Sequence, residues 1–175
     1  MAYRHYMELI KLPAEWCDDI VRRAASVEGQ NKTHVGGSRE CVIKWLNAAN
    51  GFEDVTKKLF DIVKGSNEKL WGMVIDELSY LQFTEYYPGH RYDFHQDNFW
   101  IGRTGFHRKL SIVVQLSDSE DFTGGGFGFK HQNSPPSFEK GDGVIFPSPL
   151  EHRAFPVETG KRIVLVGWAQ GPNFM

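Results

Sequence analysis

The stretch GVIFPSPLEHRAFPVETGKRIVLVGWA, residues 143–169, decides the fold class of this sequence. It contains two apolar runs, 143–147 and 161–169, and the segment between them is rich in Pro, Gly and charged residues. Short runs of Val, Ile and Phe that are bounded by such turn residues are typical of β-strands. No helical pattern separates the two runs, so the stretch favours antiparallel strands over a parallel sheet with crossover helices.

The same strand pattern continues upstream as far as Gly72. Further runs rich in Val, Ile, Phe and Tyr alternate there with clusters of Gly, Pro, Asn and Asp, at residues 73–87, 91–97, 109–117 and 127–131. Six or more short strands without helices between them indicate an antiparallel barrel or sandwich.

The N-terminal part of the chain has a different pattern. Residues 12–26 predict an amphipathic helix, with Pro13 in its first turn and apolar side chains along one face. A second helix is predicted over residues 53–64 and should end at Gly65. The polar, Gly-rich residues 30–39 are predicted to be a loop. Both helices are interpreted as scaffolding.

The length of 175 residues suits one domain with a substantial core and is too short for two domains of ordinary size. We therefore expect a single domain over 1–175, with mostly helical support at 1–72 and a barrel core at 73–175. The predicted fold class is mainly β with N-terminal helices (α+β).

Composition limits the partners that we expect. The formal net charge is -2, so no overall cationic field attracts nucleic acid or anionic lipid. No apolar run approaches the ~18 residues of a membrane span, and the start lacks the layout of a secretory signal. Cys17 and Cys41 match no zinc or redox pattern and are interpreted as free thiols. We expect a soluble, cytoplasmic protein that is a monomer or weak dimer and binds neither nucleic acid nor membranes.

Titratable and aromatic residues are concentrated in YYPGHRYDFHQDNFW, residues 86–100. Side chains alternate between the two faces of a strand, so His95 and Asp97 should point the same way and could chelate a metal. This pair alone is a weak signal, because a single histidine is more often structural. His152, which follows the strand at 143–147, would add a third ligand. Two His and one carboxylate on one face of a metal suit non-haem iron(II), although zinc could occupy the same ligands.

Arg162 favours iron chemistry over zinc. It begins the apolar strand IVLVGW, and a buried arginine is costly unless it meets an anion, for which its fork is shaped. A dicarboxylate cosubstrate would supply that anion. The alternative is an ion pair with Glu158 or Asp142.

Several motifs agree in order and spacing with one family. They are Tyr86-x-x-Gly89-x-x-Tyr92-x-x-His95-x-Asp97, then RKLSIVVQLSD with a Gly-Gly turn, then His152, and finally Arg162 with Trp168 six residues later. From about Leu9 to the C-terminus the chain resembles the iron(II)- and 2-oxoglutarate-dependent dioxygenases of the prolyl 4-hydroxylase type, in particular small bacterial and phage-borne members. It departs from them at Gly126, where the family commonly has Glu, and at Arg162, where animal collagen-type members usually have Lys.

The resemblance implies a fold and a set of cofactors. The fold would be a double-stranded β-helix, a jelly-roll or cupin-like barrel flanked by helices. His95, Asp97 and His152 would be the catalytic iron(II) ligands, and Arg162 and Tyr86 would bind 2-oxoglutarate. Ascorbate is a candidate further cofactor, and molecular oxygen is the co-reactant.

The resemblance also implies a substrate, which would be a proline-containing peptide or protein. It would be hydroxylated at C4 with release of succinate and carbon dioxide, and Arg108, Tyr92, Trp100 and Trp168 would contact it. Three alternatives stay open. The substrate could be a free amino acid or another small molecule, the reaction could be demethylation of a nucleic-acid base, which the acidic net charge disfavours, or the barrel could be a non-catalytic cupin-like binding protein.

Overall fold

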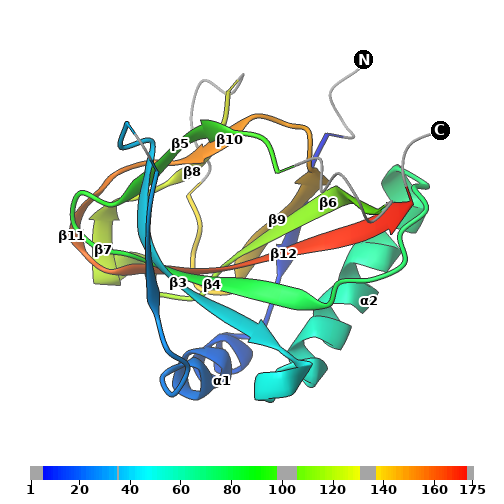
Figure 1. Cartoon of the computed structure of the whole chain (residues 1–175), viewed down its shortest axis with the longest axis horizontal. Coiled ribbons are helices and arrows are strands. Elements are labelled where there is room, and N and C mark those ends of the chain that lie inside the picture. The colour runs from blue at the N-terminus through cyan, green and yellow to red at the C-terminus, as the bar shows by residue number, and fades with distance from the viewer. Residues whose placement is uncertain (1–5, 35, 98–105, 131–136, 173–175) are drawn as a thin grey trace.

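The computed structural model describes residues 6–34, 36–97, 106–130 and 137–172, except for the side chain of Phe106. Two α-helices and a curled antiparallel sheet make up this part of the chain (Figure 1). The helices are α1 (Ala14–Ala24) and α2 (Glu53–Leu70). The strands are β1 (Glu8–Lys11), β2 (Gln30–Thr33), β3 (Arg39–Asn47), β4 (Tyr80–Tyr86), β5 (Arg91–His95), β6 (Phe106–Gln115), β7 (Phe122–Gly124), β8 (Phe127–Phe129), β9 (Asp142–Pro147), β10 (His152–Ala154), β11 (Val157–Gly160) and β12 (Arg162–Pro172).

The strands of the main sheet follow the order β1-β9-β6-β12-β4-β3-β5-β10-β8, and β2 pairs with β3 as an additional strand. All their pairings are antiparallel, and β11 with β7 forms a separate pair. In Figure 1 the sheet curls so that β5, β10 and β8 lie across from β4, β12 and β6. The prediction of a mainly β jelly-roll barrel with flanking helices is confirmed.

Side-chain alternation divides the core into two parts. On β12, Ile163 and Leu165 face the helices and pack in one apolar cluster, while Val164 packs in a second cluster inside the curl. Strand β4 repeats the pattern, with Leu81 and Phe83 toward the helices and Tyr86 toward the interior. The long strands therefore stabilise the fold with one face and line the interior with the other.

Both predicted helices are present and cover the outer face of the long strands (Figure 1). The second continues past Gly65 to Leu70, so the prediction that this glycine ends it was wrong. A glycine inside a helix costs only about 1 kcal/mol. The end is fixed instead by Asn67, whose side-chain amide donates to the Met73 carbonyl and accepts from the Met73 amide.

Residues 1–72 contain more strand than the sequence predicted. Strands β1, β2 and β3 lie in this part, and β3 pairs with β4 near the middle of the sheet. The predicted loop at 30–39 contains β2, which pairs with β3 over its whole length. This corrects the description of residues 1–72 as mostly helical support. No helix in the described part of the chain is both long and apolar enough to cross a membrane.

Candidate metal centre

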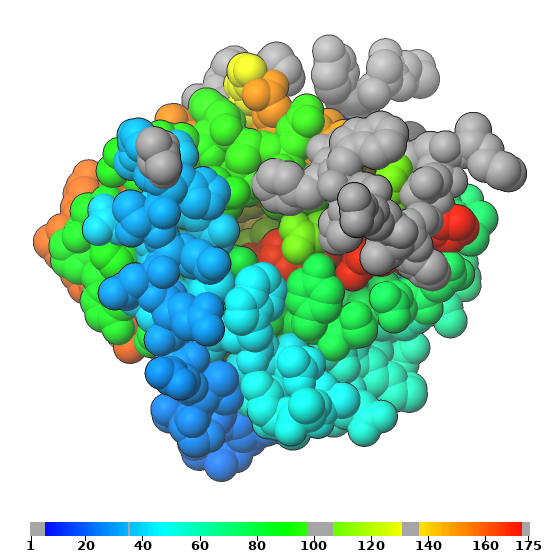
Figure 2. Space-filling model, viewed as in Figure 1, coloured from blue at the N-terminus to red at the C-terminus, as the bar shows by residue number. Residues whose placement is uncertain are grey.

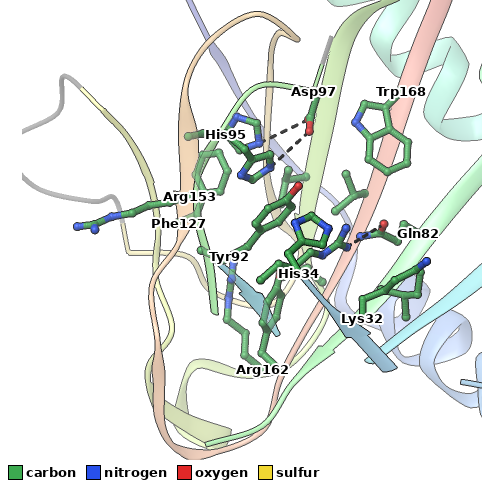
Figure 3. A pocket seen from close by; sticks show the side chains of 18 of the residues that line it. Lys32, His34, Gln82, Tyr92, His95, Asp97, Phe127, Arg153, Arg162 and Trp168 are labelled. Carbon is green, nitrogen blue, oxygen red and sulfur yellow. Dashed lines mark hydrogen bonds and ion pairs between the residues drawn. The ribbon is translucent and has the colours of Figure 1, made fainter. Parts of the chain in front are cut away.

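Three potential metal ligands meet at the junction of β5 and β10. His95 ends β5 and lies directly opposite His152 at the start of β10, while Asp97 follows in the bend after β5. One ligand atom from each residue lies within 4.8 Å of the others. His95 Nε2 is 3.5 Å from Asp97 Oδ1, and His152 Nε2 is 3.5 Å from Asp97 Oδ2 (Figure 3). The structure thus brings together the three ligands predicted from the sequence.

Both histidines are held in the same tautomer. His95 Nδ1 lies 2.8 Å from the Asp93 carbonyl oxygen, and His152 Nδ1 lies 2.8 Å from the Leu150 carbonyl oxygen. A carbonyl only accepts, so each Nδ1 carries a proton, and in a neutral imidazole the Nε2 lone pair then faces the cluster. Metal-binding histidines are oriented in this way by backbone carbonyls. The donor set therefore fits a metal.

Two serines orient the carboxylate of Asp97, Ser111 directly and Ser148 through Ser111. Ser111 Oγ on β6 donates to Asp97 Oδ2 over 2.8 Å, and Ser148 Oγ lies 2.9 Å from Ser111 Oγ. The Asp97 amide also donates to the Ser148 carbonyl over 2.9 Å. All three side chains are buried. Neither serine was predicted from the sequence to be a functional residue. The one feature that could have indicated Ser111 is its position as a polar residue within the apolar run KLSIVVQLS.

Charge states in the cluster favour metal binding. Burial raises the pKa of Asp97, but its contacts with His95 and His152 outweigh burial and hold that pKa well below its usual range. Burial lowers the pKa of His152, and the negative charge of Asp97 opposes this only in part. Asp97 is therefore ionised, which is the state that a metal requires of a carboxylate ligand.

A cavity of about 260 Å³ extends from this cluster into the curl of the sheet. Asp97 and Arg162 lie toward opposite ends of it in Figure 3. Its volume corresponds to about nine water molecules, which suits a small organic ligand. The described residues that line it are Lys32, His34, Arg39, Ile43, Trp45, Gln82, Tyr86, Tyr92, His95, Asp97, Arg108, Val113, Phe127, His152, Arg153, Ala154, Arg162, Val164, Val166 and Trp168.

Arg162 is a buried cation without a carboxylate partner in the described part of the chain. Its side chain is 3% exposed, and its Nε donates to Gln115 Oε1 over 3.0 Å. Burial lowers the pKa of Arg162 to about 10, and the nearby Tyr86 opposes that shift. The alternative ion pair with Glu158 or Asp142 does not form. An unpaired buried charge is costly, so this position fits an anionic ligand.

Two tyrosines that the sequence analysis singled out line the cavity. Tyr86 lies opposite Arg162 in the pairing of β4 with β12, and the Arg162 guanidinium carbon is 5.9 Å from the centre of its ring. Tyr92 stacks on His95, with ring centres 3.5 Å apart and planes within 9°. Its contact with His95 makes Tyr92 a support of the metal cluster as well as part of the cavity wall.

Two of the remaining predicted substrate contacts, Trp168 and Arg108, line the cavity. Trp168 lies on β12, and the Arg108 guanidinium carbon is 3.8 Å from the centre of its ring. Arg108 also donates to the Tyr80 hydroxyl over 3.1 Å. Trp100 lies outside the described residues.

The glycine turn beside Arg162 has a packing role. Gly125 has φ +63°, and a Cβ at that position would lie 2.8 Å from Val157 Cγ2 and 3.2 Å from Arg162 Cδ. A larger residue would therefore press on the arginine side chain. Gly126, where the family commonly has Glu, lines a second cavity beside this turn.

One wall of the main cavity was not anticipated from the sequence. Strands β2 and β3 form a hairpin that contributes Lys32, His34 and Arg39. The Arg39 guanidinium carbon lies 4.5 Å from the centre of the Tyr92 ring, on which His34 packs edge-on. In Figure 2 this hairpin, coloured blue, borders a hollow in the surface.

Comparison with known proteins identifies the family. A sequence model described as the 2OG-Fe(II) oxygenase superfamily matches residues 81–170, which is half of the chain and contains the whole metal cluster. The chain belongs to the 2OG-Fe(II) oxygenase superfamily. Membership of this superfamily implies iron(II) and 2-oxoglutarate as cofactors.

Curated relatives of this oxygenase chain include PKHD-type hydroxylases. That of Crocosphaera subtropica is 35% identical over 91 residues, which cover 50% of this chain and 41% of the relative. That of Prochlorococcus marinus is 25% identical over 140 residues, which cover 77% of this chain and 62% of the relative. The chain thus spans less than two thirds of the length of these curated relatives.

Solved structures support the fold. A Pseudomonas putida prolyl-4-hydroxylase superposes with a TM-score of 0.76 at 20% identity, covering 97% of this chain and 95% of that one. The viral collagen prolyl hydroxylase of Paramecium Bursaria Chlorella virus-1, in its 2OG complex, gives 0.72 at 19% identity, with 96% and 97% covered. At these identities the likeness establishes the fold alone.

Proposed function

We propose that this chain is an iron(II)- and 2-oxoglutarate-dependent dioxygenase that hydroxylates a C–H bond, with C4 of a prolyl residue in a peptide or protein as its target. The observation that carries the proposal is the placement of His95, Asp97 and His152 in one cavity with the unpaired cation Arg162. The proposal agrees with the family and with the hydroxylase names of the curated relatives.

His95, Asp97 and His152 would hold iron(II) through two imidazole nitrogens and one carboxylate oxygen. When bound, iron would supply the redox chemistry by which 2-oxoglutarate, oxygen and the substrate C–H bond give succinate, carbon dioxide and the hydroxylated product. The backbone carbonyls of Asp93 and Leu150 keep both Nδ1 atoms protonated, so the Nε2 atoms would be the ones that bind the metal. All three ligands line the cavity, so small molecules could reach a metal held there.

Arg162 would bind the distal carboxylate of 2-oxoglutarate, and Tyr86 would lie beside it. Two features of Arg162 suit this role. Its Nε is fixed by Gln115, which leaves the outer edge of the guanidinium available for a bidentate contact. Its burial excludes water, so the contact with an anion is stronger than it would be in solvent.

The prolyl residue would lie against the aromatic wall of the cavity. Tyr92 and Trp168 line that wall, and Arg108 is held on one face of Trp168. Proline-rich peptides are extended and carry no internal hydrogen bonds, so aromatic surfaces dock them at small entropic cost. Trp100 belongs to the same proposal from the sequence alone.

Oxygen-dependent succinate formation from 2-oxoglutarate tests the reaction class. The iron-loaded protein should form succinate, and a non-catalytic barrel should not. Blocked proline peptides, free L-proline and methylated oligonucleotides then test the substrate. A mass gain of one oxygen atom on the peptides is expected. Gain on free L-proline alone would assign a small-molecule hydroxylase, and formaldehyde release from the oligonucleotides would show that the peptide assignment is wrong.

A further inference from the structure

The β2–β3 hairpin places two cations on the cavity wall. Arg39 and Ile43 of β3 both line the cavity. Side chains alternate along a strand, so Cys41, which lies between these two residues, is on the same face. Lys32 lies directly opposite Cys41 in the pairing of β2 with β3 and therefore points to the same side. Glu40, the acidic neighbour of Arg39, is exposed and points to the other side of the hairpin.

The cavity carries more positive than negative charge. Its described lining includes five Lys or Arg residues and one carboxylate, in a chain whose net charge is -2. That carboxylate, Asp97, is engaged by His95 and His152. The wall is therefore locally cationic, and such a wall attracts anions. The cations are Lys32, Arg39, Arg108, Arg153 and Arg162.

Three of these five cations already have another role, another contact or another direction. Arg162 lies at the far end, where we place the cosubstrate carboxylate. Arg108 packs on Trp168. The guanidinium carbon of Arg153 lies 4.7 Å from the Phe94 ring centre and 3.8 Å from that of Phe155, and the group points away from the cavity (Figure 3).

Lys32 and Arg39 remain without a compensating charge. Neither has a carboxylate within ion-pair distance in the part of the chain that the structure describes. Two of the five Arg39 donors are accounted for, because its Nε contacts Cys41 Sγ at 3.3 Å and its Nη2 donates to Gln82 Oε1 over 3.1 Å. These contacts hold the guanidinium in place while donors remain for a ligand.

We propose that Lys32 and Arg39 bind acidic side chains that flank the target residue of an extended peptide substrate. This inference rests on the proposed function and adds its substrate class. Lys32 lies opposite a position two residues from Arg39, which is roughly 7 Å along the strand, and β2 lies about 5 Å to the side of β3, so the two backbone positions are about 8 Å apart. Alternate side chains of an extended peptide are separated by a similar distance, roughly 7 Å, so two acidic residues match the wall better than one carboxylate does.

The test measures binding rather than turnover. The protein is loaded with Mn(II) and 2-oxoglutarate under nitrogen, and three fluorescent proline peptides with both ends blocked are titrated. The peptides carry Glu, Gln or Lys on both sides of the proline. We expect the Glu peptide to bind roughly fivefold or more tightly than the Gln peptide, and the Lys peptide to bind least.

A variant with the opposite charge at position 32 tests the role of the wall, and a variant at position 57 is its control. Lys32→Glu should abolish the preference for the Glu peptide over the Gln peptide, because the pair at positions 32 and 39 then carries one negative and one positive charge. Lys57→Met, on the exposed surface of α2, removes a cation outside the cavity and should keep the wild-type order.

Equal affinity for the three peptides, or no binding by any of them, overturns the inference. Competition by free L-proline as strong as that by the unlabelled Glu peptide would assign the wall to an α-carboxylate and overturn the peptide source. Mn(II) affinity and succinate formation, measured on the same preparation, report separately on the proposed function. Intact metal binding and succinate formation with equal peptide affinities would reject the substrate class alone.

Discussion

Ser111 donates its hydroxyl hydrogen to Asp97, with 2.8 Å between Oγ and Oδ2, and both side chains are buried. Because a carboxylate only accepts, the hydrogen between Ser111 and Ser148 must come from Ser148. The proposed metal ligand is therefore oriented by a chain of two hydroxyls, from Ser148 in the turn after β9 to Ser111 on β6. Such outer partners commonly affect metal affinity by 10- to 100-fold.

Ser111→Ala should weaken Mn(II) binding by about tenfold or more, because Asp97 loses the contact that fixes its orientation. Titration of the apoprotein with Mn(II), followed by calorimetry, gives the affinity. Ser26→Ala removes a hydroxyl that bonds a backbone carbonyl on the exposed surface and is the control. Unchanged affinity in Ser111→Ala would show that Asp97 needs no such support.

His152→Ala should abolish succinate formation and lower Mn(II) affinity by more than about a hundredfold, because a direct ligand contributes more than an outer partner. Circular dichroism should show an unchanged fold. His90→Ala removes an imidazole outside the cluster and should retain both properties. Full succinate formation by His152→Ala would refute the ligand assignment.

Arg162→Met should raise the Kd for 2-oxoglutarate by about tenfold or more, since a charge-assisted bidentate contact contributes roughly 1.5 to 3 kcal/mol. Glu158→Gln should leave the Kd near its wild-type value, because Glu158 forms no ion pair with the arginine. Equilibrium binding to the Mn(II)-loaded proteins provides the comparison. If Glu158→Gln had the larger effect, the anion at Arg162 would be the protein's own carboxylate.

Saturating 2-oxoglutarate should raise the Tm of the Mn(II)-loaded protein. A ligand at a hundred times its Kd stabilises the folded state by about 2.7 kcal/mol, which for a domain of this size is roughly 5 to 10 °C. Scanning calorimetry measures the shift. In Arg162→Met at the same ligand concentration the shift should be much smaller, and an equal shift would place the cosubstrate elsewhere.

Two glycines should respond in opposite directions to alanine. Gly65→Ala should stabilise the fold by about 0.5 to 1 kcal/mol, because the residue is inside α2 and its Cβ would meet nothing within 4 Å. Gly125→Ala should destabilise it by about 1 to 3 kcal/mol, because φ is positive and the Cβ would press on Val157 and Arg162. Urea unfolding gives both values. A stable Gly125→Ala variant would show that the turn can shift.

The sequence predicted the metal cluster because the signal is local. His95 and Asp97 share a face through their spacing of two, His152 follows the apolar run at 143–147, and Arg162 begins the next apolar strand. The contact between Ser111 and Ser148 could not be predicted from the sequence. It depends on the register of β6 with β9, and the two serines are 37 residues apart, so no local pattern indicates it.

The β2–β3 hairpin was missed for another physical reason. Strand β2, QNKT, has no apolar alternation, and three of its four side chains are exposed. It is a strand because β3 provides the hydrogen-bonding edge, so tertiary context outweighs local preference. Because β2 lacks apolar alternation, the sequence did not predict a cavity position for Lys32. Without the pairing to β3 it would be interpreted as an ordinary loop lysine.

The place of β12 in the sheet makes completion of the cavity depend on a long-range strand pairing. This strand lies between β4 and β6, although both precede it in the chain, and Arg162 pairs with Tyr86 across 76 residues of sequence. Pairings between such distant residues close large loops and slow folding. Until β12 inserts, β4 and β6 present open edges that other chains can join. A nascent chain could therefore assemble His95 beside His152 through the β5–β10 pair before it acquires Arg162, and it would reach the dicarboxylate-binding state only once β12 has paired with β4.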